Sequence, residues 1–218
     1  MLTTVAKTTC VAVGTRFATR SVNDPLPESL AAALVALSAC LAASSTPGII
    51  IGGVAASLLG RPRLTRDIDV LVDLADERLQ ALLAVAQDFG IAPRIEHPEE
   101  FARRSRVLLL RHVASQIDID LILGTLPFEL EAVAAGQVRH AGPIEVRLPR
   151  VEDLMIMKAI AHRPRDMHDL EALLVAHPGA DLTRAKQWVR EFAIAATMPE
   201  LIEDFERLIR ETTARFRP

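Results

Sequence analysis

The segment GIIIGGVAASLLGRPRLTRDIDVLVD, residues 48–73, carries two carboxylates where a buried strand would be expected. An apolar run breaks at Gly52-Gly53, and Asp67 and Asp69 lie within a second apolar run after a helical turn and a basic loop. Residues two apart in a strand point to the same side. We therefore expect the two carboxylates to share one face of a strand, although such a pair also occurs on solvent-facing edge strands.

A second pair of acids repeats this arrangement. Asp118 and Asp120 alternate with apolar residues in QIDIDLILG, residues 116–124. If the two strands lay side by side, three or four carboxylates would gather, and their repulsion and burial would be unfavourable without a divalent cation. All-oxygen ligands favour Mg²⁺ or Mn²⁺ over zinc. The alternative for Asp118 is an ordinary half-exposed antiparallel strand.

The paired glycines suggest a phosphate-binding turn. Gly52-Gly53 lies between a short apolar run and a helical segment, and backbone N–H groups at a helix amino terminus can hold a triphosphate. Two carboxylate-bridged metal ions can activate a hydroxyl and stabilise leaving pyrophosphate. A Gly-Gly pair alone is usually only a turn. The order of paired glycine, Asp-x-Asp and a later acid indicates phosphoryl or nucleotidyl transfer.

Composition sets the broad class of protein. The chain has 218 residues, of which 50% are hydrophobic, enough to bury a sizeable core. Its net charge of -3 gives no general attraction to nucleic acid, so polyanion binding would need a local patch. Cys10 and Cys40 lack zinc-ligand spacing and favour a reducing, cytoplasmic setting. The longest apolar stretch, residues 30–43, is too short to span a bilayer, so no membrane segment is predicted.

The hydrophobic pattern predicts an α/β (α+β) fold, with a mixed sheet flanked by helices and followed by a C-terminal helical bundle. We expect residues 1–22 to be a disordered amino terminus or the result of a start codon assigned too far upstream, and the alternative is a leader segment, whose composition they share. We expect a core over 23–149 and a helical domain over 150–218. The predicted strands cover 49–51, 68–72, 106–113, 116–123 and 144–148. A first helix is predicted to be capped by Asn23-Asp24-Pro25 and to have an apolar stripe formed by Leu26, Leu30, Leu34, Leu37 and Leu41. Further helices are predicted over 54–59, 76–89 and 128–135.

Three motifs resemble those of the nucleotidyltransferase superfamily with the DNA polymerase beta-like fold. They are GGVAASLLGRPRLTRDID, IDLILGTLPFE and EDLMIMKAIAHRPRDMHDLEALL, and the region that carries them extends from Gly48 to about Leu174. Within the superfamily, the chain is similar to the branch of abortive-infection (AbiE) type IV toxin nucleotidyltransferases and their small bacterial relatives. The third motif is the most specific for that branch.

The resemblance implies roles for the acids and glycines. Asp67, Asp69 and Asp120 would be the catalytic and metal-binding residues, and Asp120 would help to deprotonate the acceptor. Asp118 is a further candidate ligand. Gly52 and Gly53 match the phosphate-binding turn, but most of the superfamily has Gly-Ser there, so the side-chain hydroxyl is missing at this turn. The implied substrate is an NTP such as ATP.

Two basic residues are candidate phosphate ligands. Lys158 would neutralise the nucleotide phosphates, and its alternative is a solvated lysine whose stem covers apolar surface. Arg66 belongs to a basic loop with Arg61, Arg63 and Thr65. That loop would bind the triphosphate or an RNA acceptor, or it is a solvated loop that balances the nearby acids.

The third motif also predicts a corner between two helices. We expect Arg163, Asp166 and Asp169 to form this corner structurally, with Asp169 pairing with Lys158 or with an arginine. The histidines that flank the corner, His162 and His168, have no ligand spacing and are expected to be surface residues.

The predicted function is Mg²⁺-dependent transfer of a nucleoside monophosphate from an NTP to a hydroxyl acceptor on RNA, protein or a small molecule. The family resemblance implies a toxin with an antitoxin partner. One alternative is a catalytically inactive binding module that retains the fold. Another is an antibiotic-modifying nucleotidyltransferase, against which the absence of Tyr and the single Trp188 are weak arguments, because few aromatics remain for stacking.

Overall fold

The computed structural model describes residues 26–215. The predictions for residues 1–22 and for the Asn23-Asp24-Pro25 cap lie outside these residues. Within them, the mixed α/β class followed by helices is confirmed. No helix among residues 26–215 is long and apolar enough to cross a membrane.

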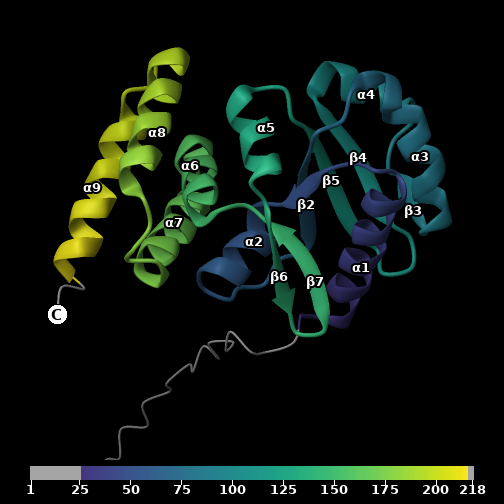
Figure 1. Ribbon diagram of the computed structural model, residues 1–218, viewed down its shortest axis with the longest axis horizontal. Coiled ribbons are helices and arrows are strands. Elements are labelled where there is room, and N and C mark those ends of the chain that lie inside the picture. The colour runs from purple at the N-terminus through teal and green to yellow at the C-terminus, as the bar shows by residue number, and fades with distance from the viewer. Residues whose placement is uncertain (1–25, 216–218) are drawn as a thin grey trace, which may run out of the picture.

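Two sheets and a series of helices make up the described chain (Figure 1). A five-stranded sheet has the order β1-β2-β5-β4-β3, and β6 and β7 form a separate two-stranded sheet. The strands are β1 (Gly48–Ile50), β2 (Asp67–Val72), β3 (Ile91–Pro93), β4 (Val107–His112), β5 (Ile117–Leu123), β6 (Gln137–Ala141) and β7 (Ile144–Leu148). The helices are α1 (Glu28–Ala43), α2 (Gly52–Leu59), α3 (Leu79–Asp88), α4 (Pro98–Ser105), α5 (Pro127–Ala134), α6 (Val151–Ala161), α7 (Pro164–Ala176), α8 (Leu182–Ala196) and α9 (Glu200–Arg215), with a short 3-10 helix at Asp76–Arg78.

One face of the strand pair β2 and β5 is apolar. Alternate residues of β2 and β5, such as Ile68, Val70, Ile119 and Leu121, are buried there in one core with α1 and α3. Because side chains alternate across a strand, the residues between them must point to the opposite face. The apolar half of the alternation therefore fixes where the acids go.

The opposite face of the sheet is divided. Toward the carboxyl ends of β2 and β5, Leu71 and Ile122 pack with Ala132 and Val133 of α5. Toward the amino ends, the same face carries carboxylates in place of apolar side chains. Helix α5 thus covers the apolar end of this face and does not cover the end that carries the carboxylates.

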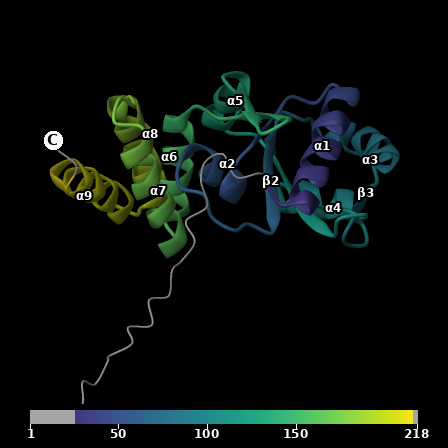
Figure 2. The same ribbon diagram turned by 90° about the horizontal axis from the view of Figure 1, so that it is seen from below.

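Helix α2 connects the C-terminal helices to β2, the strand that carries Asp67 and Asp69. Figure 2 shows α2 between β2 and the pair α6 and α7, and α2 contacts all three elements. The main core also continues from the sheet into α6–α9. The core is therefore continuous across residue 149. The predicted boundary between two domains at that position stays a prediction.

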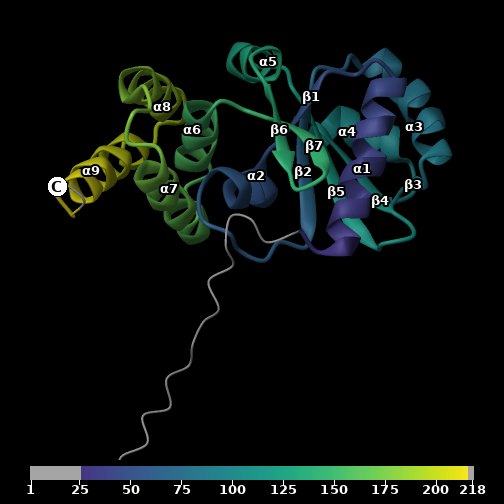
Figure 3. The same cartoon turned by 60° about the horizontal axis from the view of Figure 1, so that its bottom comes forward.

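Several elements differ from the sequence prediction. The short strand β3, the polar helix α4 and the exposed strand β6 were not predicted, because three residues ending in Pro93 and the polar segments PEEFARRS and QVRHA give no apolar periodicity. Figure 3 shows the hairpin of β6 and β7 beside β1 and α1, which β7 contacts. Helix α2 begins at Gly52 rather than Val54, and α1 begins at Glu28, after Leu26.

Candidate active site

Antiparallel pairing of β1 and β2 brings the paired glycines to the acids. Ile50 lies opposite Val70, and the Ile51 N–H donates to the Asp69 carbonyl oxygen at 2.9 Å. The next residue, Gly52, has φ +61, and a Cβ built there would lie 1.8 Å from Asp69 Oδ2. Glycine is required at this turn both by its backbone conformation and by the close approach of the carboxylate.

Parallel pairing of β2 and β5 brings the two acid pairs together. Asp67 lies opposite Asp118, and Asp69 lies opposite Asp120. All four therefore share one face at the amino ends of two adjacent strands. The structure thus brings Asp67, Asp69 and Asp120 together beside the Gly52 turn, as the motif order predicts.

The environment of this face disfavours the ionised form of two carboxyl groups, Asp69 and Asp120. Burial raises the pKa of Asp69, and the charges of Asp67 and Asp120 raise it further, whereas Lys158 and the backbone N–H of Gly53 act in the opposite direction. Burial also raises the pKa of Asp120, and Asp67 and Asp118 add to that rise against the opposing effect of Arg94. Carboxylates held close together and desolvated in this way are typical of functional sites.

Two arginines that were not predicted as site residues hold the acids of β5. Arg94 donates through Nη1 to Asp118 at 3.0 Å and through Nη2 to Asp120, while Arg111 Nε donates to the other Asp118 oxygen at 2.6 Å. The hydrogen bond from Arg111 is the largest cause that lowers the pKa of Asp118, and Arg94 adds to it. Asp118 is thus engaged by guanidinium groups on both oxygens.

A signal for one of these arginines was present in the sequence. Arg111 lies opposite Asp118 in the hairpin of β4 and β5, a pairing that follows once the hairpin register is known. Arg94 follows the unpredicted strand β3, and its N–H bonds to the Leu109 carbonyl oxygen across the sheet. Nothing local in the sequence connects Arg94 to Asp120.

The carboxylates suit a hard divalent cation, but their present arrangement is not a finished metal cage. Among residues 26–215, no group of three or more His, Cys, Asp or Glu side chains is gathered closely enough to hold an ion, and the Asp120 carboxylate is turned to Arg94. The donor set is nevertheless all oxygen, which fits Mg²⁺ or Mn²⁺. Asp67, Asp69 and Asp120 are the residues that would hold such an ion.

Lys158 is buried in the helical corner. It is 4% exposed, and its Nζ lies 2.8 Å from Asp166 Oδ1 and 2.9 Å from Asp169 Oδ2. The alternative of a solvated lysine is therefore wrong, because α6 and α7 enclose the side chain together with two carboxylates. Its assignment to the nucleotide phosphates stays a prediction.

Both carboxylates of the corner are tied to arginines as well. Arg163 Nε donates to Asp166, and Arg63 Nε donates to Asp169 at 2.8 Å. Burial acts to raise the pKa of each carboxyl, but these hydrogen bonds and those from Lys158 lower the pKa of both Asp166 and Asp169 overall. The pairing expected for Asp169, with Lys158 or with an arginine, is thus met by both partners.

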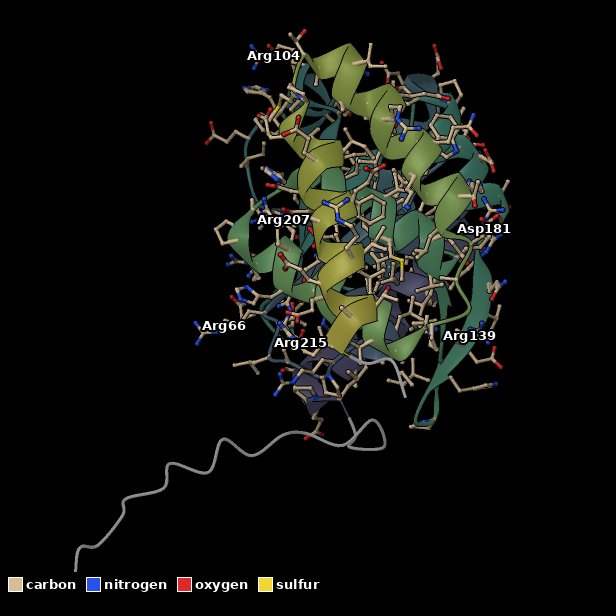
Figure 4. All side chains as sticks on the ribbon, turned by 90° about the vertical axis from the view of Figure 1, so that its left-hand side faces the viewer. Arg66, Arg104, Arg139, Asp181, Arg207 and Arg215 are labelled. Carbon is tan, nitrogen blue, oxygen red and sulfur yellow. The ribbon has the colours of Figure 1, made fainter. Side chains whose placement is uncertain are left out.

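The basic loop before β2 divides into anchored and free side chains. Arg63 is anchored by Asp169, and the Thr65 hydroxyl donates to Asp67 Oδ1 at 3.0 Å. Arg61 and Arg66 are exposed and make no ion pair among the described residues. In Figure 4, the Arg66 side chain stands at the edge of the molecule and points outward. The loop thus balances buried acids with one arginine and leaves two arginines for a ligand.

The flanking histidines have local partners. His162 Nε2 lies 2.9 Å from an oxygen of Asp204 in α9, and His168 Nδ1 lies 2.8 Å from the Pro164 carbonyl oxygen. Neither contacts the carboxylates of the sheet.

The fold is similar to that of solved structures of ANT(2'')-Ia and of a nucleotidyltransferase-like protein. The solution structure of the antibiotic-resistance factor ANT(2'')-Ia has a TM-score of 0.54 and 18% identity, over 80% of this chain and 97% of that chain. The crystal structure of ANT(2")-Ia in complex with adenylyl-2"-tobramycin has a TM-score of 0.53 and 18% identity, over 77% and 99%. An antigenic nucleotidyltransferase-like protein from Paracoccidioides brasiliensis has a TM-score of 0.51 and 14% identity, over 83% and 95%. At these identities the likeness shows a nucleotidyltransferase fold.

The family follows from the sequence match. A family model described as "Nucleotidyl transferase AbiEii toxin, Type IV TA system" matches residues 35–217. The chain therefore belongs to the AbiEii nucleotidyltransferase toxin family, and the resemblance drawn from the three motifs is confirmed. A search of curated proteins finds no match.

Proposed function

We propose that this nucleotidyltransferase transfers a nucleoside monophosphate from an NTP to a hydroxyl acceptor in a reaction that depends on Mg²⁺ or Mn²⁺. The observation that carries the proposal is the register of β1, β2 and β5, which sets Asp67, Asp69 and Asp120 beside the Gly52 turn. The ion would be held by these three carboxylates, and when bound it would polarise the phosphates and neutralise the leaving pyrophosphate.

The chain's own residues would then perform three tasks. The amino end of α2 would face the phosphates with its backbone N–H groups, and the exposed Arg66 would add a positive charge from the loop before β2. The acceptor oxygen forms a bond to the α-phosphorus, the bond to pyrophosphate breaks, and the acceptor proton passes to Asp120. Asp120 can accept this proton when Arg94, which holds its carboxylate in the structure, releases it.

The acceptor is an RNA, a protein or a small molecule, and we propose the first two in the context of a toxin controlled by an antitoxin partner. The family description supports the toxin role. ANT(2")-Ia, whose complex holds adenylyl-2"-tobramycin, shares only the fold with this chain, so a small-molecule acceptor is the second candidate.

A labelling experiment tests the proposal. The purified chain is mixed with each α-³²P-labelled NTP, Mg²⁺ and cell extract, and labelled products are divided by RNase and protease treatment, with tobramycin added in a parallel reaction. We expect one NTP to label a macromolecule and Asp67→Asn with Asp69→Asn to abolish the label. Asp73→Asn is the matched control, because Asp73 is exposed just beyond the other end of β2. No label with any NTP would contradict the enzymatic proposal.

The toxin role has a separate test. Expression of the wild-type chain in a bacterial host should slow growth, and the double Asp→Asn variant should not. Equal growth inhibition by both chains would separate toxicity from nucleotidyl transfer.

A further inference from the structure

A hydroxyl stands beside the second glycine of the turn, although that glycine has no side chain. A Cβ built on Gly53 would lie 2.7 Å from Thr65 Oγ1 and 3.1 Å from Arg63 Nη2. Thr65 therefore fills the space in which a side chain at position 53 would begin. A serine at position 53 could not be added to the present structure without moving Thr65.

The Thr65 hydroxyl is aimed at a predicted metal ligand. Its Oγ1 lies 3.0 Å from Asp67 Oδ1 and 3.3 Å from the Asp67 carbonyl oxygen. A hydroxyl has one proton to donate, and donation to the carboxylate fixes the direction of that oxygen. Because threonine is β-branched, its χ1 angle is restricted. The direction of the hydroxyl toward Asp67 is therefore restricted as well.

The loop that carries Thr65 is itself anchored on both sides. Ser57 Oγ of α2 donates to the Arg63 carbonyl oxygen at 3.1 Å, and the Arg63 guanidinium makes two bonds to Asp169 of α7, at 2.8 and 2.9 Å. Two residues before Thr65, the chain is therefore tied to the helix that begins at Gly52 and to the helical corner. This anchoring holds the hydroxyl in place relative to both Gly53 and Asp67.

We propose that Thr65 is a positioning residue, which supplies from the neighbouring loop the hydroxyl that Gly53 lacks and thereby orients the Asp67 carboxylate toward a divalent cation. This inference rests on the proposed function. It assigns to Thr65 a role that is exerted through Asp67, the residue that its hydroxyl contacts. Removing a hydrogen-bond partner that supports a metal ligand typically weakens metal affinity or activity by about tenfold to a hundredfold.

The test measures Mn²⁺ binding to the full chain by electron paramagnetic resonance, together with the NTP-labelling rate. We expect Thr65→Val, which keeps the shape and removes the hydroxyl, to weaken Mn²⁺ binding about tenfold or more and to lower the maximal labelling rate more than it raises KM for the NTP. Thr65→Ser should retain both properties. Thr125→Val is the matched control, because Thr125 is exposed beyond the other end of β5.

A rescue variant separates positioning from simple packing. Thr65→Ala should lose Mn²⁺ affinity, and adding Gly53→Ser to it should restore at least a third of the loss on a logarithmic scale, because the new hydroxyl enters the vacated space. A packing role alone would give no such recovery. Thermal melts of every variant identify any that fails to fold. If either Thr65→Val or Thr65→Ala fails to fold, the other still tests the loss of the hydroxyl.

The outcomes also distinguish this inference from the proposed function. If the wild-type chain binds Mn²⁺ but labels nothing, nucleotidyl transfer fails while the Mn²⁺ titrations still decide the role of Thr65. If Thr65→Val binds Mn²⁺ as the wild type does, or if the wild-type chain binds no Mn²⁺, the positioning role is overturned.

Discussion

At the scale of single residues, the site depends on two glycines, which have no Cβ atom. Gly52 lacks the Cβ that would collide with Asp69, and Gly53 lacks the one that would collide with Thr65. These absences let a carboxylate and a hydroxyl approach the backbone at the start of α2. Burial raises the pKa of Asp69 and Asp120, and neighbouring acids add to the rise, so we expect the ionised carboxylates to lower the stability of the fold.

Gly52→Ala should damage the site beyond its effect on the backbone. The new Cβ would lie 1.8 Å from Asp69 Oδ2 in a left-handed conformation, which by itself costs roughly 1–2 kcal/mol. We expect a drop of at least that size in the free energy of unfolding, measured in urea, together with loss of labelling.

Gly142→Ala is the matched control for this change. Gly142 also has a positive φ, of +64, but a Cβ there meets nothing within 4 Å. It should lose a similar backbone contribution and keep its labelling activity. Full activity in the Gly52 variant would show that Asp69 does not need its present position.

Asp69→Asn should stabilise the metal-free protein near neutral pH while abolishing transfer. Because the folded-state pKa of Asp69 is raised, by burial first and then by Asp67 and Asp120, its carboxyl group supports the fold when protonated and opposes it when ionised. The protonated-state contribution is present below the unfolded pKa of about 3.9 and is lost as the pH rises through the folded pKa.

The size and pH dependence of this gain can be measured directly. We expect a gain of roughly 0.5–2 kcal/mol in the free energy of unfolding at pH 7, shrinking toward pH 4, in urea titrations with EDTA. A variant that is less stable than the wild type at pH 7 would contradict the repulsion that we infer.

At the scale of elements, neighbouring strands and helices decide which charges meet. Strand β5 lies between β2, which brings two more acids, and β4, which brings Arg111. The chain after β3 adds Arg94. The sheet order therefore balances an acidic strand pair with two arginines, and one of them holds the carboxylate that the proposed reaction needs.

Arg94→Met should increase the affinity for Mn²⁺ by freeing Asp120. The side chains of this ion pair are 22% and 36% exposed, and a partly exposed pair is worth up to about 1 kcal/mol, or roughly fivefold in affinity. Isothermal titration with Mn²⁺ measures the change. Arg111→Met is the control, because Arg111 contacts Asp118 and not Asp120. Weaker Mn²⁺ binding in the Arg94 variant would show that this arginine helps to organise the site.

At the scale of the whole molecule, ion pairs bind the C-terminal helices to the sheet half. Asp169 of α7 joins Lys158 of α6 to Arg63 in the loop before β2. A second cluster joins Arg184 of α8 to Asp153 of α6 and Glu131 of α5. Helix α2 also contacts β2, α6 and α7, so the helical corner and the acid-bearing strand are packed against the same helix.

Lys158→Met should be strongly destabilising. It removes the shared partner of Asp166 and Asp169, which are both buried, and breaking a buried ion pair from one side costs roughly 3–5 kcal/mol. Urea denaturation measures the loss. Lys186→Met is the matched control, since Lys186 makes no ion pair among residues 26–215. A loss below about 1 kcal/mol would mean that the corner carboxylates find other partners.

The sequence by itself determined the local features of this protein. Apolar alternation in 68–72 and 116–123 predicted two strands with their acids on one side, and turn residues after Leu123 and Leu59 predicted where segments end. The order of paired glycine and acids indicated the class of enzyme. These features depend on spacing along the chain, which is visible without tertiary structure.

The tertiary structure decided which distant groups meet. Arg94 bridges Asp118 and Asp120 over more than twenty positions, and Lys158 is buried rather than solvated. Such pairings depend on strand register and helix packing, which place side chains together irrespective of their separation along the chain. Hydrophobic periodicity carries no information about which charge will lie opposite which, so the electrostatics of this site could be established only from the folded molecule.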